Sequence, residues 1–474
     1  MKRLIISINI LLATALSTYS QGVHSLYFLN EWSQRHTMNA AFAPEYGYFS
    51  LPVLGGVNLD LNSNMGMNTF LFPADPKPML FMNQNVDAQT FIKGLSTDNY
   101  LRQSMELNLL SFGFYTQQNS FWSFDLTLKE NLNVNLPIDL FRFMKLGMAN
   151  PTSNIYNLKN LGIDQTNIAQ LSLGYSRDIN SQFRVGVNAK VLVGLSSEKI
   201  SYSKFDVSLS QNSFEVNAVG ESQIAASFLS LKTDSVGNYD LQNPIINTSK
   251  IQPAGIGLAV DLGVTYKPIE NLTLALGIND LGYMKWNASS ISKGTASSDV
   301  SFNGFNNVDV AKVDIQGQVD TLLNGLENIT KFKPATSVND ISEIIPYNIK
   351  VSAEYSIFNN QKHDILVGVL FHSYNSKSYS VNELVAALTF KPLSWLTLSG
   401  TCELLRPDFN RYGVALNISP CWINLYIASD FITPKVNPQF MPIDKVNLNL
   451  IFGGSIVIGR PEKHKDGPQA RWSN

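Results

Sequence analysis

Residues 255–280 read GIGLAVDLGVTYKPIENLTLALGIND, and this stretch decides the fold. Apolar side chains occupy every second position from Ile256 to Tyr266 and again from Leu272 to Ile278, with small or polar residues between them. Because successive side chains of a β-strand point to opposite faces, each run has one apolar face and one small, polar face. Residues 268–271 separate the runs and contain a proline and an asparagine, as turns often do. The stretch therefore predicts an antiparallel hairpin.

The same period of two recurs along most of the chain and predicts about fourteen strands. Most of the runs have a length near the ~9–11 residues that cross a bilayer at a tilt. The expected strands lie at approximately 54–63, 105–116, 120–134, 168–178, 182–196, 256–267, 271–282, 347–358, 362–374, 379–391, 394–404, 409–418, 421–431 and 444–458.

The connections between these strands also follow a pattern. Those after even-numbered strands are short, and most of those after odd-numbered strands are longer, which is the layout of a bacterial outer-membrane barrel with its short turns in the periplasm. We therefore predict an all-β fold, a transmembrane antiparallel β-barrel of about fourteen strands over residues 54–458. Residues 197–255 leave the exact strand count open, because they hold strand-like pieces of their own at 200–209 and 214–219.

The chain begins with the features of a secretory signal peptide. Lys2 and Arg3 precede an apolar stretch at 4–16, and small residues at 18–20 form a suitable cleavage site. We expect residues 1–20 to be removed; a retained N-terminal anchor is the alternative. No cysteine stands directly after the leader, which argues against a lipoprotein anchor.

The composition agrees with a membrane barrel. Charged residues make up 15% of the chain, below the ~25% of ordinary soluble proteins, while 18 Tyr, 27 Phe and 6 Trp make aromatic residues plentiful. A net charge of −2 gives no reason to expect a nucleic-acid partner. No mature segment offers the ~20 consecutive apolar residues of a spanning helix. A soluble secreted β-protein is the alternative.

Charged residues inside the predicted strands should face the lumen, because a charge on the lipid face costs about 2–4 kcal/mol near the midplane. The lumen-facing candidates are Asp125, Lys129, Arg184, Lys190, Asp261, Lys350, Glu354, Glu403, Arg411 and Asp430. This set mixes both signs, which argues against an ion-selective ring. Positions of the opposite parity, such as Ile256, Leu274 and Val351, are expected to face lipid.

Several segments do not read as spanning strands. Residues 21–53 precede the first strand and are expected to pack inside the barrel as a plug, or else to lie at its periplasmic mouth. Apolar residues at helical spacing predict short helices in the loops at 87–95, 136–147 and 319–329. Residues 459–474 form a polar tail that we expect in the periplasm.

The sequence offers no recognisable catalytic, cofactor or metal motif. The five histidines are scattered without metal-ligand spacing, and no nucleophile elbow occurs. Cys402 and Cys421 fall on non-adjacent expected strands and predict no disulfide. We expect no enzyme, no cofactor and no bound metal; His372 with Glu354 is the one catalytic pairing that the strand map leaves to be tested.

Two stretches near the N-terminus, RHTMNAAFAPEY at residues 35–46 and SLPVLGGV at residues 50–57, resemble the start of an uncharacterised outer-membrane barrel family of Bacteroidetes type. That family tends to carry an Asn-Pro-Ala-Phe-x-Pro element followed by Leu-Pro; here Ala40 stands where the family often has proline. Residues 140–147 and 346–355 are also similar. The resemblance implies a signal peptide and a barrel, and it brings no catalytic residues. More distantly, the strand count and the segment before the first strand resemble FadL- and PorV-type barrels.

These observations lead to a functional expectation. The chain is expected in the outer membrane of a Gram-negative envelope, in contact with lipid, where it binds or passes a small solute. The FadL resemblance implies that this ligand is hydrophobic. The alternative is a non-conducting barrel that docks partner proteins in secretion or envelope organisation. Fold alone does not decide between them.

Overall fold

The computed structural model describes most of the chain. Four features predicted from the sequence lie outside the described residues: the signal peptide at 1–20, Arg411, the helix at 319–329 (except Ile329) and the tail beyond residue 459. The described ranges are 24–50, 55–74, 77–116, 120–149, 154–210, 213–241, 244–247, 252–302, 329–360, 363–377, 379–405, 412–431 and 445–459. The division into leader, N-terminal segment, barrel and tail stays a prediction.

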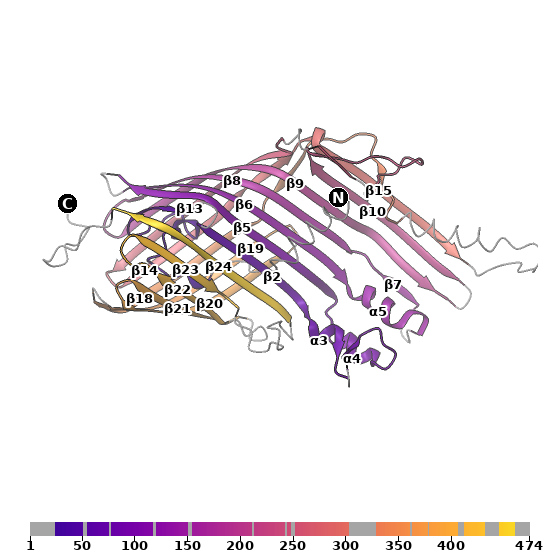
Figure 1. Cartoon of the computed structure of the whole chain (residues 1–474), viewed down its shortest axis with the longest axis horizontal. Coiled ribbons are helices and arrows are strands. Elements are labelled where there is room, and N and C mark those ends of the chain that lie inside the picture. Colours follow the sequence, from indigo (N-terminus) through magenta and orange to yellow (C-terminus); the bar gives the residue numbers. More distant parts are fainter. Residues whose placement is uncertain are drawn as a thin grey trace, which may run out of the picture.

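Within these ranges, fourteen antiparallel strands close into a barrel (Figure 1). In order around the barrel they are β2 (Gly56–Gly66), β5 (Asp98–Tyr115), β6 (Phe121–Pro137), β8 (Gly162–Asp178), β9 (Phe183–Leu209), β13 (Gly255–Ile269), β14 (Leu272–Trp286), β18 (Tyr347–Asn360), β19 (His363–Asn375), β20 (Ser380–Leu393), β21 (Leu396–Glu403), β22 (Tyr412–Ile418), β23 (Ile423–Ser429) and β24 (Lys445–Ile458). Each strand pairs with the next, and β24 pairs back with β2, where Val57 faces Phe452. The predicted fold class and strand positions are confirmed.

The two faces of the barrel wall differ as the sequence predicted. Along β13, Ile256 and Leu258 are 54% and 50% exposed, whereas the alternating residues Gly257 and Ala259 and the carboxylate of Asp261 are buried. An apolar outer surface around a polar interior is the arrangement of a transmembrane barrel.

Among the described residues, no helix has the length and apolar character needed to cross a membrane.

Three strands extend beyond the barrel rim, two of them over the strand-like pieces at 200–209 and 214–219 and the third within the connection expected at 283–346. β9 is 27 residues long. Its first half pairs with β13, and its second half pairs with β10 (Phe214–Ala226), which in turn pairs with β15 (Ile291–Phe302). Figure 1 shows β10 and β15 projecting past the end of the barrel. Apolar residues of this second half, among them Tyr202 and Val207, are buried against the extension, although the β9–β10 register shifts opposite Val219 and Gly220.

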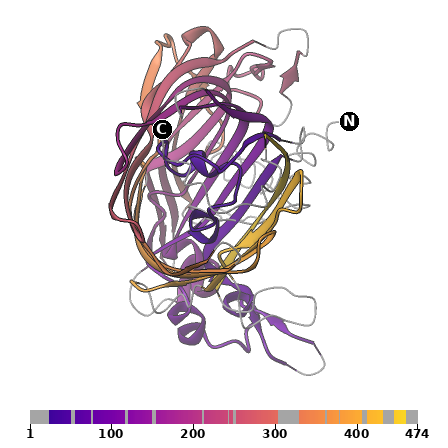
Figure 2. The same cartoon turned by 90° about the vertical axis from the view of Figure 1, so that its left-hand side faces the viewer.

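Short helices form a lobe at the same end (Figure 2). They are α3 (Met67–Phe70), α4 (Ala88–Lys93) and α5 (Ile138–Leu146), and the last two match expected helices. The Asp87 carboxylate caps α4 by accepting a 2.7 Å hydrogen bond from the backbone N–H of Thr90. Gly147, with φ of 48°, ends α5. Phe81, Phe91 and other apolar side chains form the core of the lobe.

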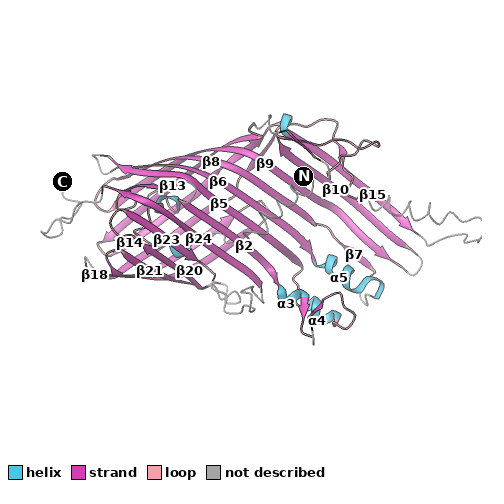
Figure 3. Cartoon of the chain, viewed as in Figure 1, coloured by secondary structure: helices cyan, strands magenta, loops and turns pink. Residues whose placement is uncertain are grey.

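Smaller elements complete the fold, and Figure 3 distinguishes the helices from the strands. They are α2 (His24–Tyr27), β1 (Gly47–Ser50), β3 (Leu71–Phe72), β4 (Met79–Leu80), β7 (Ile155–Asn157), β11 (Leu229–Ser230), β12 (Ile245–Ile246), β16 (Lys333–Pro334) and β17 (Ile341–Ile344), with 3₁₀ turns η1 (Arg35–Thr37), η2 (Gly147–Ala149) and η4 (Ala288–Ser290).

Residues 24–46, called here the inner segment, lie inside the ring of strands (Figure 2). The segment leads into β1, which pairs with β24 and β5 at the short-turn end. Leu26, Leu29 and Trp32 pack against one part of the wall, on β22–β24. Tyr27 and Phe28, with Phe42, pack against another part, on β14, β19 and β20.

Glycines in the wall make room for the inner segment. A Cβ atom at Gly186 would lie 1.9 Å from the carbonyl oxygen of Ala40, and one at Gly263 would lie 2.0 Å from Oδ1 of Asn39. At Gly368 the same atom would lie 2.1 Å from the ring of Phe28. The small residues of the lumen-facing register are therefore needed for close packing of the segment.

We expect Gly186→Val to displace the inner segment and to lower the free energy of unfolding by at least about 1–3 kcal/mol, the usual cost of overpacking. Urea unfolding in detergent, combined with the rate of proteolysis within residues 24–46, measures both effects. Gly400→Val is the matched control, because a Cβ there meets no atom within 4 Å. Equal behaviour of the two variants would contradict the role assigned to Gly186.

Candidate functional site

A cavity of about 330 Å³ lies in the lumen, in the half remote from the short turns. Thr37 and Met38 of the inner segment line it on one side. Its charged lining balances in sign: six cationic residues (Arg102, Lys129, Lys190, Lys199, Lys350 and Lys377) and six anionic residues (Glu106, Asp125, Asp164, Asp261, Asp280 and Glu343). Amide and hydroxyl side chains make up most of the remaining lining residues, and apolar side chains such as Leu192, Met284 and Trp286 complete the lining.

Asp280 reaches the cavity because β14 contains a bulge. The register of β13 against β14 shifts between Val260 and Leu262, and Asp280 adopts a left-handed backbone with φ of 62°. Its backbone N–H donates a 2.7 Å hydrogen bond to Oδ1 of Asp261. The bulge lets two consecutive residues, Asn279 and Asp280, both line the cavity.

The sequence contained a signal for this bulge that our prediction missed. Apolar residues of β14 occupy even positions through Ile278, and the next two, Leu281 and Tyr283, occupy odd positions, so the period of two breaks between Ile278 and Leu281. Asn and Asp are the residues that tolerate a left-handed backbone best after glycine. A bulge adds one residue to a strand, so the apolar positions move from even to odd numbers across it, as they do here across Asn279 and Asp280.

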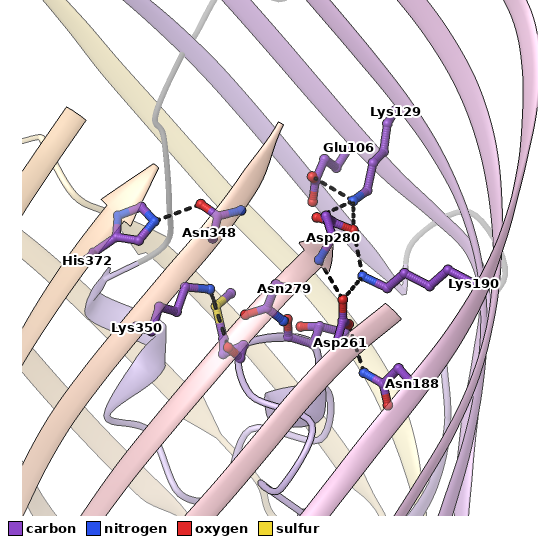
Figure 4. A network of polar contacts seen from close by, with 12 residues as sticks. Glu106, Lys129, Asn188, Lys190, Asp261, Asn279, Asp280, Asn348, Lys350 and His372 are labelled. Carbon is purple, nitrogen blue, oxygen red and sulfur yellow. Dashed lines mark hydrogen bonds and ion pairs between the residues drawn. The ribbon is translucent and has the colours of Figure 1, made fainter. Parts of the chain in front are cut away.

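Asp280 is the centre of a buried charge network (Figure 4). Nζ of Lys190 lies 2.6 Å from carboxylate oxygens of both Asp261 and Asp280. Nζ of Lys129 lies 3.3 Å from Asp280 and 3.7 Å from Glu106. Three strands that the sequence did not link, β6, β9 and β14, thus meet through two lysines and one shared carboxylate.

Three other predicted lumen residues bind the inner segment. The Asp125 carboxylate lies 3.0 Å from Nε2 of His36, and Glu354 lies 2.5 Å from Nη2 of Arg35. Asp430 accepts backbone N–H hydrogen bonds from His24 and Ser25 at 2.8 and 2.9 Å. All three acids are buried, so each holds the segment where water competes little.

Two predicted residues lie apart from the cavity. Arg184 pairs with Asp178 at 3.1 Å beside the β8–β9 turn. Glu403 accepts backbone hydrogen bonds from Leu384 and Leu405 at the end of β21. Both stabilise strand ends and do not join the network.

Lys350 is a buried cation of the cavity lining to which the described residues offer no ion pair. Its Nζ lies 3.4 Å from the carbonyl oxygen of Met38, and no described carboxylate forms an ion pair with it. Figure 4 shows its side chain between Asn279 and the Asn348–His372 pair.

The pairing of His372 with Glu354 that the sequence left to be tested is not made. Glu354 binds Arg35 instead. Nδ1 of His372 lies 3.1 Å from Oε2 of Glu383 and 3.1 Å from Nε2 of His24. His24 is 348 positions away in the chain, so no spacing rule could have joined it to His372.

Comparison with known proteins gives one family match. The model of a family described as "Family of unknown function (DUF5723)" matches residues 40–430. No curated protein matches the chain. The expectation of an uncharacterised family, drawn from residues 35–57, is confirmed.

Solved structures give distant likenesses only. The toluene transporter TodX of P. putida is 11% identical, with 94% of this chain and 96% of that chain covered and a TM-score of 0.37. The toluene transporter TbuX of Ralstonia pickettii is 7% identical, with 89% and 93% covered and a TM-score of 0.38. A Pseudomonas aeruginosa FadL homologue is 10% identical, with 91% and 92% covered and a TM-score of 0.32. The architecture described above rests on the strand pairing of this chain.

We expect Asp280→Asn to lower the free energy of unfolding by about 3 kcal/mol, because Lys129 and Lys190 lose the carboxylate that they share. Urea unfolding followed by tryptophan fluorescence measures the change. Lys285→Gln is the control, since Lys285 and Asp340 form an exposed pair whose loss should matter little. A similar, small effect of both substitutions would show that the network does not stabilise the barrel.

Proposed function

The chain belongs to the family of unknown function DUF5723, and we propose from its own geometry that it is an outer-membrane barrel that binds a small polar solute in its lumen and passes it when the inner segment moves. The observation that carries this proposal is the cavity, whose lining holds many polar side chains, is balanced in charge and is bordered by the inner segment.

The size and lining of the cavity favour a small, polar, electrically neutral or zwitterionic solute. Its volume of about 330 Å³ falls at the lower end of small-molecule sites, which span roughly 300–1,000 Å³. A hydrophobic ligand, as the FadL resemblance implies, would cover amide and charged groups without offering them hydrogen bonds, at a cost of about 1–3 kcal/mol for each group left unpaired. The lining therefore argues for a partner that can donate and accept.

We assign Lys350 the contact with an anionic or acceptor group of the solute. A buried ammonium group without a carboxylate partner gains most from a ligand that brings one. The side-chain amides of Asn279 and Asn348 lie beside it and offer further hydrogen bonds (Figure 4). A small zwitterion or an acidic sugar carries the anionic group and the hydrogen-bonding groups that these side chains would bind.

We assign the inner segment the role of a plug. Arg35, His36 and the backbone at His24 bind wall carboxylates, and two apolar clusters hold the rest of the segment. Because these contacts are spread over several strands, the closed state is expected to dominate, and a solute would pass only after the segment shifts.

A second candidate function, docking of a partner protein, is favoured by one observation. Leu80, Met82, Met144, Met148 and Ile155 of the helical lobe are all 44–58% exposed. Exposed apolar side chains gathered on a projecting lobe are typical of protein contact surfaces. A barrel that stays shut under every condition would make this the better proposal.

Deletion of residues 24–46 is expected to turn a nearly closed barrel into an open one. Liposome swelling with small sugars and single-channel conductance should both rise at least tenfold over the full-length protein. Heat-modifiable mobility in gels serves as the control for a folded, inserted barrel. Gly186→Val is a second route to the same displacement, in case the deletion variant does not fold. Folded variants without increased flux would overturn the plug and favour docking.

Lys350→Gln is expected to weaken binding of the solute while leaving the barrel intact. Uptake of a zwitterionic amino acid into liposomes, measured with the deletion variant, should fall about tenfold relative to uptake of a neutral sugar of similar size. Lys377→Gln is the matched control, since Lys377 also lines the cavity. Equal loss for both solutes, or equal loss in both variants, would contradict the role given to Lys350.

A further inference from the structure

Three buried side chains meet where the inner segment contacts β19 and β20. Nε2 of His24 lies 3.1 Å from Nδ1 of His372 and 3.2 Å from Oε2 of Glu383, and the last two atoms are 3.1 Å apart. The three side chains are 7%, 0% and 1% exposed. The three atoms thus form a nearly equilateral triangle, shielded from water.

The hydrogen bonds between these side chains place acceptor atoms of the triangle opposite one another. Oδ1 of Asn348 lies 2.8 Å from Nε2 of His372 and accepts its hydrogen, so Nδ1 of the same ring carries a lone pair. Nδ1 and the Glu383 carboxylate, both acceptors, then face each other at 3.1 Å. Nε2–H of His24 can donate to only one of them. One hydrogen therefore cannot satisfy all three atoms, whereas a cation bound by all three can.

The geometry suits a transition metal. Zinc binds imidazole nitrogen at about 2.0–2.1 Å and carboxylate oxygen at about 2.0–2.2 Å, in tetrahedral arrangement. Ligands at those distances lie roughly 3.3 Å from one another. The observed edges of 3.1–3.2 Å are close to this value. Two imidazoles and one carboxylate are also a ligand set that zinc takes, with a fourth position left for water or solute.

We propose that His24, His372 and Glu383 form a Zn²⁺ site that fastens the inner segment to the barrel wall. Asn348 supports the site by holding the His372 ring in the tautomer that presents Nδ1. Asp430 supports it by holding the backbone of His24 through a hydrogen bond of 2.8 Å. Because His24 lies on the inner segment and the other two ligands lie on the wall, bound metal would hold the segment in place.

Metal stoichiometry tests the site independently of transport. The full-length protein, stripped with chelator, folded in detergent and passed through a desalting column after exposure to Zn²⁺, is expected to carry one Zn²⁺ per chain by plasma mass spectrometry. His372→Ala and Glu383→Gln should each lower the affinity at least tenfold. His36→Gln is the matched control, because His36 is also a buried histidine of the inner segment and glutamine keeps a donor for the wall carboxylate of Asp125. Heat-modifiable mobility confirms folding in each case.

Two further measurements keep the proposal decidable if a ligand variant does not fold. Co²⁺ added to the wild-type protein should give the visible absorption of a tetrahedral nitrogen–oxygen site. Asn348→Ala should weaken binding about 10–100-fold, as loss of a supporting hydrogen bond does elsewhere. Wild-type protein that binds no Zn²⁺ and gives no Co²⁺ spectrum would overturn the site and assign the triangle to a shared proton. Loss of metal in the His36 variant to the same degree as in the ligand variants would overturn it too.

Discussion

The width of a fourteen-stranded barrel is the constraint on which the rest of this structure depends. In barrels of about eight strands, wall side chains fill the interior, whereas wider barrels leave space that something must occupy or that water must fill. Here the inner segment occupies part of that space, and wall glycines such as Gly186 and Gly368 keep the approach close. The apolar clusters around Leu26 and Phe28 make the filled half of the lumen a protein core rather than a channel.

Filling only part of the lumen produces the cavity. Beyond the inner segment, none of the described segments covers this part of the wall, and charged residues there bind one another. Lys190 between Asp261 and Asp280 is the clearest case, and the β14 bulge is what brings the second carboxylate within reach. The charges of the lining balance in sign, and Lys350 is a buried cation among them whose Nζ contacts a backbone carbonyl oxygen.

The contacts of the inner segment give it two kinds of attachment. Apolar packing supplies most of its buried surface, while a few polar anchors fix its register: Arg35 on Glu354, His36 on Asp125, and His24 in the cluster with His372 and Glu383. The polar anchors are the ones that a change of charge, a proton or a metal ion can alter. A segment held in this way combines a stable apolar attachment with polar contacts that chemistry at a single site can change.

The sequence by itself determined the barrel, its fourteen strands, its two faces and two of its loop helices, because alternation, turn residues and helical spacing are local properties. It also selected Asp125, Lys190, Asp261 and Glu354 as inward-facing charges, since a charge within a spanning strand has only one tolerable side. The partners of those charges came only from the tertiary structure. His24 meets His372, and Asp280 meets Lys129, across distances in the chain that no period encodes, because closing the barrel and inserting the inner segment bring them together. The sequence marked strand-like pieces at 200–209 and 214–219, but only the pairing of β9 with β10 shows that these residues extend a barrel strand beyond the rim.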